Sequence, residues 1–349
     1  MNNTVIDKET GITNNPAQVV SVKESTTGKN TLQEIAEVLK AAGSVLIFPH
    51  ISADGDALGS AVALCAALRS LGKTSYVVLE DKIPEMIAFL CGCYCTRDQK
   101  VVTAPDLCVM VDCGEMDRIP RRKVLFESAR ERMCIDHHMT TQPFLDWNYI
   151  DKYAAATAEI IFDLMEILGV ETTKFIGEAI YTGIVTDTGR FQYSNTTSHT
   201  HNIMAKLYDK GVRPVEIAIR LYQSVSMEKM VLESRIINAA RVFADSRAVL
   251  SVVTKKMLAE SGALAEDADG VVEKLRDLKG IEVAVIIKEN NGEYKVSIRT
   301  KKWVNAAAIS EKNGGGGHLR AAGYSVKKSL TKVKDEIIAE IERSLSENQ

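Results

Sequence analysis

One carboxylate followed directly by two imidazoles is the part of this sequence best suited to chemistry. The chain has only six histidines among its 349 residues, yet His137 and His138 stand side by side behind Asp136. The apolar run of residues 133–135 precedes them, so we expect the triplet at the end of a buried strand. Carboxylate and imidazole groups together can bind metal ions or transfer protons.

Other acidic residues and a further histidine also follow apolar runs. His50, Asp54 and Asp56 come after "SVLIF", Asp112 comes after "DLCVMV", and Asp187 ends the helix-like run "FIGEAIYTGIVTD". In an open parallel sheet, the residues just past the carboxyl ends of the strands gather in one crevice. We therefore expect these side chains to converge with the triplet.

Several carboxylates in one crevice would repel one another, and divalent cations would relieve that repulsion. Oxygen ligands with a few imidazoles and no thiolate favour manganese or magnesium, and the histidines favour Mn²⁺ over Mg²⁺. Each residue alone has a simpler interpretation: Asp54 or Asp187 could cap a helix, and His50 could be an ordinary loop histidine. Their joint occurrence, each after an apolar run, favours a metal site.

The elements that would position these residues alternate between strand and helix. Four runs, "SVLIFPH", "TSYVVLE", "DLCVMVD" and "RMCID", have the pattern of buried strands, and residues 156–244 have a mostly helical pattern. This alternation predicts an α/β fold with a doubly wound parallel sheet. Three later strands, "AVLSVVT", "EVAVIIKEN" and "EYKVSIRT", with a turn signal at Asn290-Asn291-Gly292, predict a smaller α+β domain.

These patterns divide the chain into four parts. We expect a disordered polar tail at 1–28, a domain with the metal site at 29–220, a helical linker at 221–242 and a second domain at 243–346. Within the second domain, residues 288–334 hold eleven Lys and Arg against three acids, which suggests either an anionic ligand or a solvated basic face.

Composition excludes some classes of protein. A net charge of -3 argues against a protein that coats long nucleic acid. No apolar run reaches the roughly 18 residues of a membrane span, and the first residues lack the pattern of a signal peptide, so we expect a cytoplasmic protein with reduced thiols. Cys91, Cys93 and Cys95 lack the spacing of a zinc knuckle and are interpreted as buried or incidental thiols. The oligomeric state, including a homodimer, stays open.

Four of these segments resemble the motifs of a known superfamily. "HISADGDALGS", "VDCG", "IDHH" and "GIVTDTGRF" are similar to the four motifs of the DHH-type phosphoesterases, the RecJ-like superfamily. "NGGGGHLRAAG", residues 313–323, resembles the glycine-rich signature of the DHH-associated substrate domain. The two-domain size is most like the branch of nanoRNases that are also 3′-phosphoadenosine 5′-phosphate (PAP) phosphatases. That branch commonly has a proline before the first aspartate where this chain has Ser52-Ala53, which indicates a different loop geometry.

The resemblance implies a dinuclear metal site in the first domain. One metal would be held by His50, Asp54 and Asp112, and the other by Asp56, Asp112, His137 and Asp187, with Asp112 as the bridge. Asp136 would orient the site, and His138 would face the substrate and could protonate the leaving oxygen. Hydrolysis would proceed by direct attack of a hydroxide between the metals, without a covalent intermediate.

The glycine run suggests how the second domain holds substrate. Gly315, Gly316, Gly317 and His318 are predicted to form a phosphate-binding backbone nest at the N-terminus of a helix that begins with "LRAAG". The resemblance assigns His318 and Arg299 to a substrate phosphate, with Arg190 as a weaker candidate near the metals. His199 and His201 look instead like the polar opening of a helix.

The expected activity is hydrolysis of short oligoribonucleotides to mononucleotides and of PAP to AMP. A long strand is not expected as substrate, since long strands need aromatic platforms and the aromatic content is 6%. Cleavage of cyclic di-AMP or pApA is an alternative that the sequence hardly distinguishes from hydrolysis of other short RNA and PAP. Inorganic pyrophosphate is disfavoured because the glycine-rich signature resembles the nucleotide-handling branch. A nucleotide-binding regulator without turnover is the alternative of another class, disfavoured because every metal position is filled.

Overall fold

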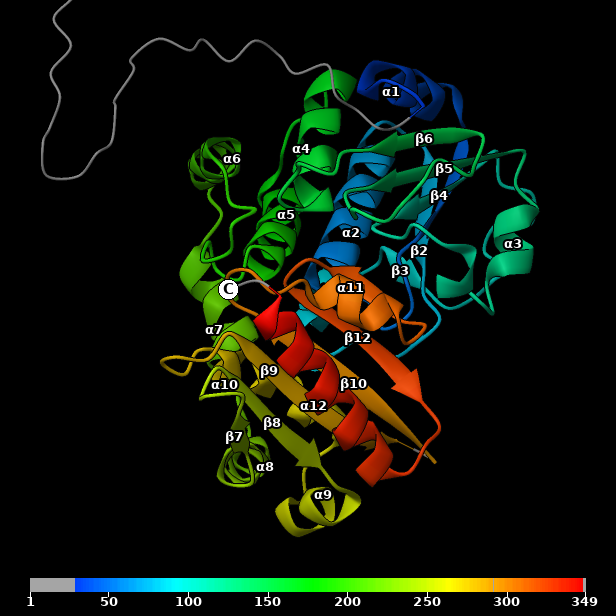
Figure 1. Cartoon of the computed structure of the whole chain (residues 1–349). Coiled ribbons are helices and arrows are strands. Elements are labelled where there is room, and N and C mark those ends of the chain that lie inside the picture. Colours follow the sequence, from blue (N-terminus) through cyan, green and yellow to red (C-terminus); the bar gives the residue numbers. More distant parts are fainter. Residues whose placement is uncertain (1–28, 291, 348–349) are drawn as a thin grey trace, which may run out of the picture.

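Two sheets with their own helices make up the computed structural model (Figure 1). The structure describes residues 29–290 and 292–347. The predicted tail at 1–28 lies outside the described residues, and so does Asn291 of the predicted turn. The predicted fold class, a parallel-sheet domain followed by a smaller α+β domain, is confirmed.

The first sheet has six strands in the order β3-β2-β1-β4-β5-β6, and every neighbouring pair is parallel. Its strands are β1 (Ser44–Phe48), β2 (Thr74–Val78), β3 (Cys95–Thr96), β4 (Leu107–Val111), β5 (Glu131–Asp136) and β6 (Trp147–Ile150). The four predicted runs form β1, β2, β4 and β5. The short edge strands β3 and β6 were missed by the sequence patterns.

Helices cover both faces of this sheet, which is why its strands are apolar on both sides. On one face lie α1 (Leu32–Ala41), α2 (Gly55–Ser70), α4 (Thr157–Leu168) and α5 (Lys174–Asp187), and on the other α3 (Lys123–Glu127). Alternate residues of β1 enter the two cores, Val45 and Ile47 into the first, Leu46 and Phe48 into the second.

The order of the strands creates a crevice beside β1. The chain passes from β1 outward to β2 and β3 and then returns to the other side of β1 at β4. At such a switch point the connections leave the sheet in opposite directions, which opens a crevice at the carboxyl ends of β1 and β4. The first predicted metal ligands follow these two strands.

The helical region predicted at 156–244 continues beyond α5 as three helices. These are α6 (Ser198–Asp209), α7 (Pro214–Tyr222) and α8 (Met227–Asn238). Pro214 at the first position of α7 and the Ser226 hydroxyl, which accepts from Lys229 N at the start of α8, mark two separate helices. The predicted helical region is therefore divided into separate helices, and its last residues form a strand, β7 (Arg241–Phe243).

The second sheet has the order β11-β12-β10-β9-β8-β7 and is antiparallel except between β8 and β9. Its other strands are β8 (Ala248–Val253), β9 (Val283–Asn290), β10 (Glu293–Thr300), β11 (Gly316–His318) and β12 (Ala321–Val326). Asn290 pairs with Glu293, as the turn signal predicted for β9 and β10.

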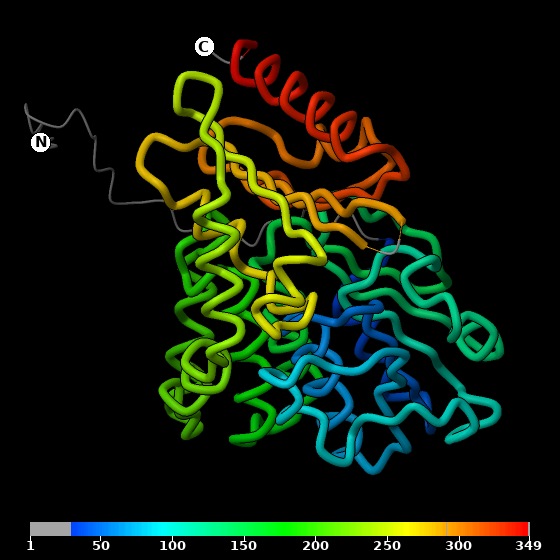
Figure 2. Tube along the Cα trace, turned by 90° about the horizontal axis from the view of Figure 1, so that it is seen from below, coloured from blue at the N-terminus to red at the C-terminus, as the bar shows by residue number. Residues whose placement is uncertain are grey.

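Helices also cover both faces of the second sheet. One face carries α11 (Ala306–Glu311) and α12 (Leu330–Ser346), and the other carries α8 and α10 (Val271–Arg276). Figure 2, turned by 90°, shows α12 lying lengthwise on one side of this sheet. The short helix α9 (Lys255–Ser261) follows β8. Within the described residues, no helix has both the length and the apolar character needed to cross a membrane.

The prediction of a helix after the glycine run was wrong. Residues 316–318 and 321–326 form the antiparallel hairpin β11–β12, in which Gly317 pairs with Ala322. A Cβ on Gly317 would lie 2.5 Å from Ala321 O, and one on Gly315 would clash with Gly323 O. These glycines therefore allow two strands to approach closely, and the run does not lie at a helix N-terminus.

Candidate metal centre

Three neighbouring strands deliver the predicted ligands to one edge of the first sheet. His50 lies two positions beyond β1, Asp112 directly follows β4, and Asp136 is the last residue of β5. His137 and His138 continue from β5. Because β1, β4 and β5 are adjacent and parallel, their carboxyl ends bring all five side chains together.

Helices α2 and α5 add the remaining carboxylates. Asp54 caps α2 by accepting from the backbone N–H groups of Asp56 and Ala57, and Asp187 is the last residue of α5. The two helices pack closely because α5 has glycine at 183, where a Cβ would lie 2.8 Å from Asp56 Oδ1. Asp54 thus has both roles: it caps α2, as its simpler interpretation predicted, and it also lies at the site.

Asp112 lies at the centre of the cluster. Its Oδ2 is 3.6 Å from His50 Nε2, and its Oδ1 is 3.5 Å from His137 Nε2. Asp54 Oδ2 lies 3.9 Å from His50 Nε2. Asp187 Oδ2 lies 3.4 Å from His137 Nε2. Asp112 thus presents one oxygen to each of two histidines.

Four overlapping groups of side chains in the described residues could hold a cation, and two of them match the predicted metal positions. One contains His50, Asp54 and Asp112, the other Asp56, Asp112 and His137, and the ligand atoms of each group lie within 4.8 Å of one another. Asp112 belongs to both groups. Carboxylate oxygens and imidazole nitrogens without a thiolate suit Mn²⁺ or Mg²⁺, so the residues present fit a pair of divalent cations.

The two histidines are held in the orientation that a metal ligand needs. His50 Nδ1 lies 2.7 Å from Ile51 O, and His137 Nδ1 lies 3.2 Å from Ala154 O. A carbonyl oxygen only accepts, so each Nδ1 carries a hydrogen and each Nε2 is the nitrogen turned toward the carboxylates. Against burial, the carboxylates around His137 raise its pKa to about 9, so its Nε2 also carries a proton until a cation displaces it.

Burial and crowding make these carboxylates hard to ionise without a cation. Burial, with the neighbouring Asp112 carboxylate, raises the pKa of Asp56 to about 7. Burial also raises the pKa of Asp187 to about 7 and that of Asp112 to about 6. Asp112 further has a φ of +55°, a left-handed conformation that is uncommon outside glycine. Strained backbone and crowded acids at one point are typical of a functional site.

Asp136 orients the ring of His138. His138 Nδ1 lies 2.7 Å from Asp136 Oδ1, which also accepts from His137 N at 2.8 Å. Burial favours the neutral imidazole, but Asp112 and Asp136 outweigh it and raise the pKa of His138 to about 10. The Asp136 contact occupies Nδ1 and leaves Nε2 of His138 available to a substrate.

Two threonines at the site were missed by the sequence analysis. At the start of α4, Thr157 N donates to Asp56 Oδ2 at 2.7 Å, and Thr157 Oγ1 donates to Asp112 Oδ1 at 2.8 Å. Thr141 Oγ1 donates to Asp136 Oδ2 at 2.5 Å. A helix N-terminus attracts a carboxylate, so the start of the helical pattern near Thr157 was the one available signal. No pattern marks Thr141.

The second domain reaches the site through its glycine-rich hairpin. The ring of His318 stacks on His138 with centroids 4.6 Å apart, and lies 5.6 Å from His137. A further contact between the domains places the Arg276 guanidinium over the Tyr193 ring at 5.4 Å. The centre is therefore covered from the side of the second domain.

The other predicted substrate residues have partners of their own. Arg299 Nε donates to Glu273 Oε1 at 2.7 Å, and Arg190 lies over the Tyr222 ring at 4.9 Å. His199 and His201 lie in the first turn of α6, as expected, and His199 also pairs with Asp163. The structure thus brings His318 to the metal centre but places Arg299 and Arg190 in other contacts.

Two sequence features outside the ligand set have local explanations. Ser52 has a φ of +54° and donates its N–H to Asp81 Oδ2 at 3.0 Å, so the loop before Asp54 has its own geometry. Cys91, Cys93 and Cys95 are free thiols. Within residues 29–290 and 292–347, the side-chain groups able to hold a cation contain only histidine and aspartate.

Comparison with known families gives two matches along the chain. Residues 44–184 match the DHH family, N-terminal domain, and residues 248–347 match the DHHA1 domain. The chain is 35% identical over 296 residues to the "Bifunctional oligoribonuclease and PAP phosphatase NrnA" of Thermus thermophilus, covering 84% of this chain and 87% of that protein. The Bacillus subtilis protein of the same name is 25% identical over 319 residues, covering 90% of this chain and 99% of that one.

Solved structures show the same fold. An exopolyphosphatase-related protein from Bacteroides fragilis has a TM-score of 0.82 and 23% identity, with 90% of this chain and 95% of that chain covered. RecJ from Thermus thermophilus, in complex with Mn²⁺, has a TM-score of 0.53 and 15% identity, with 91% of this chain and 55% of that chain covered.

Proposed function

Because this chain belongs to the DHH family and carries a DHHA1 domain beyond its metal centre, we propose that it is a metal-dependent phosphoesterase. Its substrates are short oligoribonucleotides, hydrolysed to mononucleotides, and PAP, hydrolysed to AMP. The observation that carries this proposal is the carboxylate and histidine cluster that His318 of the second domain covers. The substrates follow from the full-length similarity to bifunctional oligoribonucleases and PAP phosphatases.

The metal roles proposed for the side chains follow their positions. His50, Asp54 and Asp112 hold one cation, and Asp56, Asp112, His137 and Asp187 hold the other. Mn²⁺ suits the two imidazole ligands best, with Mg²⁺ as the alternative. When bound, such a pair of cations acidifies a water molecule and neutralises the phosphoryl oxygens.

The chain's own residues supply the remaining steps. Asp136 occupies Nδ1 of His138 and thereby directs the other ring nitrogen toward the substrate. His138 Nε2 is then the atom that can donate a proton to the leaving oxygen. Thr157 fixes Asp112 and Asp56, so that neither carboxylate can turn away from the centre. His318, which the glycine hairpin positions, holds the end of the substrate.

The closeness of the two domains favours short substrates. His318 stacks on His138, so the second domain lies directly over the reacting end of any bound strand.

We propose that Arg299 and Arg190 bind substrate phosphate only after exchanging their present partners, Glu273 and Tyr222. A regulator without turnover is disfavoured because the set of metal ligands is complete.

A panel of substrates tests the proposed function. Purified protein with Mn²⁺ would be incubated separately with pApA, PAP, a five-nucleotide RNA, a twenty-four-nucleotide RNA and pyrophosphate. We expect mononucleotides from the short RNAs and AMP from PAP, with little cleavage of the long strand or of pyrophosphate. Rapid digestion of the long strand would contradict the preference for short substrates. No turnover of any substrate with either cation would refute the activity itself.

The glycine hairpin gives a prediction with a matched control. Gly317→Ala should push β11 away from β12, because the new Cβ would lie 2.5 Å from Ala321 O at a φ of +137°. Displacement of His318 should raise KM for short RNA about tenfold and change kcat less, as expected for a residue that holds substrate. A Cβ on Gly316 meets nothing within 4 Å, so Gly316→Ala is the control and should keep the wild-type KM. Equal effects of the two substitutions would contradict this role of the hairpin.

A further inference from the structure

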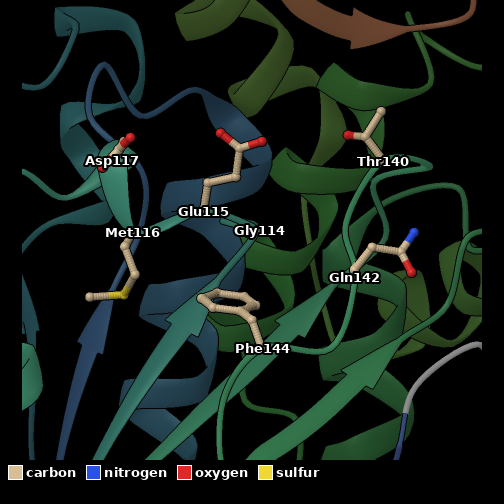
Figure 3. A pocket seen from close by; sticks show the side chains of 7 residues that line it. All are labelled: Gly114, Glu115, Met116, Asp117, Thr140, Gln142 and Phe144. Carbon is tan, nitrogen blue, oxygen red and sulfur yellow. The ribbon is translucent and has the colours of Figure 1, made fainter.

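A hollow of about 410 Å³ opens beside the metal centre, at the carboxyl ends of β4 and β5. Figure 3 shows Glu115 and Asp117 on one side of it and Thr140 and Gln142 on the other, with Phe144 between. None of these residues takes part in the reaction steps proposed above.

Asp136, which is fully buried, lies between the hollow and the catalytic site. One oxygen of this carboxylate, Oδ1, meets His138, while Oδ2 accepts from Thr141. Gly114, which also lines the hollow, lies against the same Oδ2, because a Cβ at this position would be 2.8 Å from it. The hollow therefore begins on the opposite side of Asp136 from His138.

One wall of the hollow is anchored to the sheet, and the other is held by a turn within its own loop. Asn148, which is fully buried in β6, accepts with its Oδ1 from the N–H groups of Phe144 and Leu145, at 3.0 and 3.1 Å. On the other wall, the carbonyl of Glu115 accepts from Arg118 N at 3.1 Å. A site on anchored walls needs little reordering when a ligand enters.

The chemistry of the lining excludes phosphate and suits a nucleoside. Within the described parts of the chain, the side chains of Glu115, Asp117, Thr140 and Gln142 make no hydrogen bond or ion pair with the protein. Two carboxylates repel a phosphate but accept hydrogen bonds from ribose hydroxyls and base amino groups. Phe144, a residue that is 38% exposed, offers a ring on which a base can stack.

The two proposed substrates differ by one nucleoside. In both reactions a water oxygen bonds to phosphorus, the bond from phosphorus to a 3′ oxygen breaks, and that oxygen leaves with a proton. The leaving group is a nucleotide in each case. The short RNA, unlike PAP, carries a second nucleoside beyond the phosphate that is cut.

We propose that the hollow between Glu115 and Phe144 is the binding site for this second nucleoside. The inference rests on the proposed function. The 5′-terminal nucleotide lies under His318 on one side of the scissile phosphate, and the second nucleoside lies beyond Asp136 on the other. The same metal centre can then hydrolyse both substrates, because short RNA fills the hollow with its second nucleoside and PAP leaves the hollow empty. Glu115 and Asp117 bind the ribose, and Phe144 stacks on the base.

Two variants separate this site from the catalytic centre. The first variant is Phe144→Ala, which removes the stacked ring, and the second combines Glu115→Gln with Asp117→Asn, which removes the ribose contacts. Each variant should lower kcat/KM for pApA about tenfold. Hydrolysis of PAP should stay within about twofold of wild type, since no ligand group enters the hollow. The exposed Glu266, changed to glutamine, is the control and should affect neither substrate.

The outcomes are distinguishable. Equal losses on pApA and PAP, or no loss on either, would overturn the nucleoside site. A wild-type protein that turns over neither substrate would instead refute the proposed function. A pApA analogue with a 2′-deoxy second nucleoside tests the ribose contact, because the deoxy substitution and the carboxylate substitutions should not be additive. Additive losses would overturn the assignment of the ribose to Glu115 and Asp117.

Discussion

Asp112→Asn should reduce the hydrolysis of both short RNA and PAP by a factor of about a thousand or more, as removal of a central catalytic group does. The two oxygens of Asp112 face His50 and His137 separately, so this side chain is common to both cation groups. An amide has one acceptor oxygen and no charge, so it could not bridge the two proposed cations as a carboxylate would. Both substrates should lose activity together because both need the same centre.

At position 112, asparagine is a better substitution than alanine because of the backbone conformation. Asp112 has a φ of +55°, and asparagine tolerates this left-handed conformation while alanine is strained in it. An asparagine Oδ1 can still accept the hydroxyl of Thr157. The exposed Asp335 on α12, changed to asparagine, is the matched control. If Asp112→Asn folds normally and keeps a tenth of the wild-type kcat/KM, the shared role of Asp112 is wrong.

The grouping of the metal-site residues could be predicted because it depends on local pattern and one rule of topology. His50, Asp112 and Asp136 each follow a run that is apolar enough to be a buried parallel strand. Once the strands are parallel, their carboxyl ends must meet, whichever way the loops run. Asp187 was harder to place because it ends a helix and does not follow a strand. Its position comes from the contact between α2 and α5.

The residues that support these side chains could not be found in the same way. Thr157 and Thr141 act through single hydroxyls, and their positions depend on where α4 and the loop after β5 pack. Edge strands β3 and β6 are short and only partly buried, so neither has the apolar run that marks the central strands. Both failures concern tertiary packing, which local propensity does not determine.

The glycine hairpin shows where local pattern is ambiguous. The run Ala321-Ala322-Gly323 suits a helix as well as a strand, because small residues fit both. Pairing with β10 decides the outcome, since Ile298 and Val296 oppose Ala322 and Tyr324 across the sheet. The structure places His318 beside the metal centre, where the sequence analysis expected a substrate residue, but on a strand and not before a helix.

Adding Mn²⁺ should raise the thermal stability of the protein. Burial raises the pKa of Asp56 and Asp187 to about 7 and that of Asp112 to about 6, so without a cation the folded state holds protons that the unfolded state releases. The free energy of unfolding of the metal-free protein should therefore fall as pH rises from about 4 to 7. A cation at about a hundred times its Kd would add about 2.7 kcal/mol to the free energy of unfolding.

That gain should raise Tm by about 5–10 °C for a domain of this size, measured by calorimetry at pH 7 with and without chelator. Chelation should remove both the increase in Tm and the hydrolysis of PAP, and Mg²⁺ should give a smaller increase than Mn²⁺ because imidazole ligands favour the softer ion. Asp112→Asn is the control, since losing a ligand shared by two cations should remove most of the increase. An equal increase in Asp112→Asn would mean that the cation stabilises the chain somewhere else, and the dinuclear centre would then be refuted.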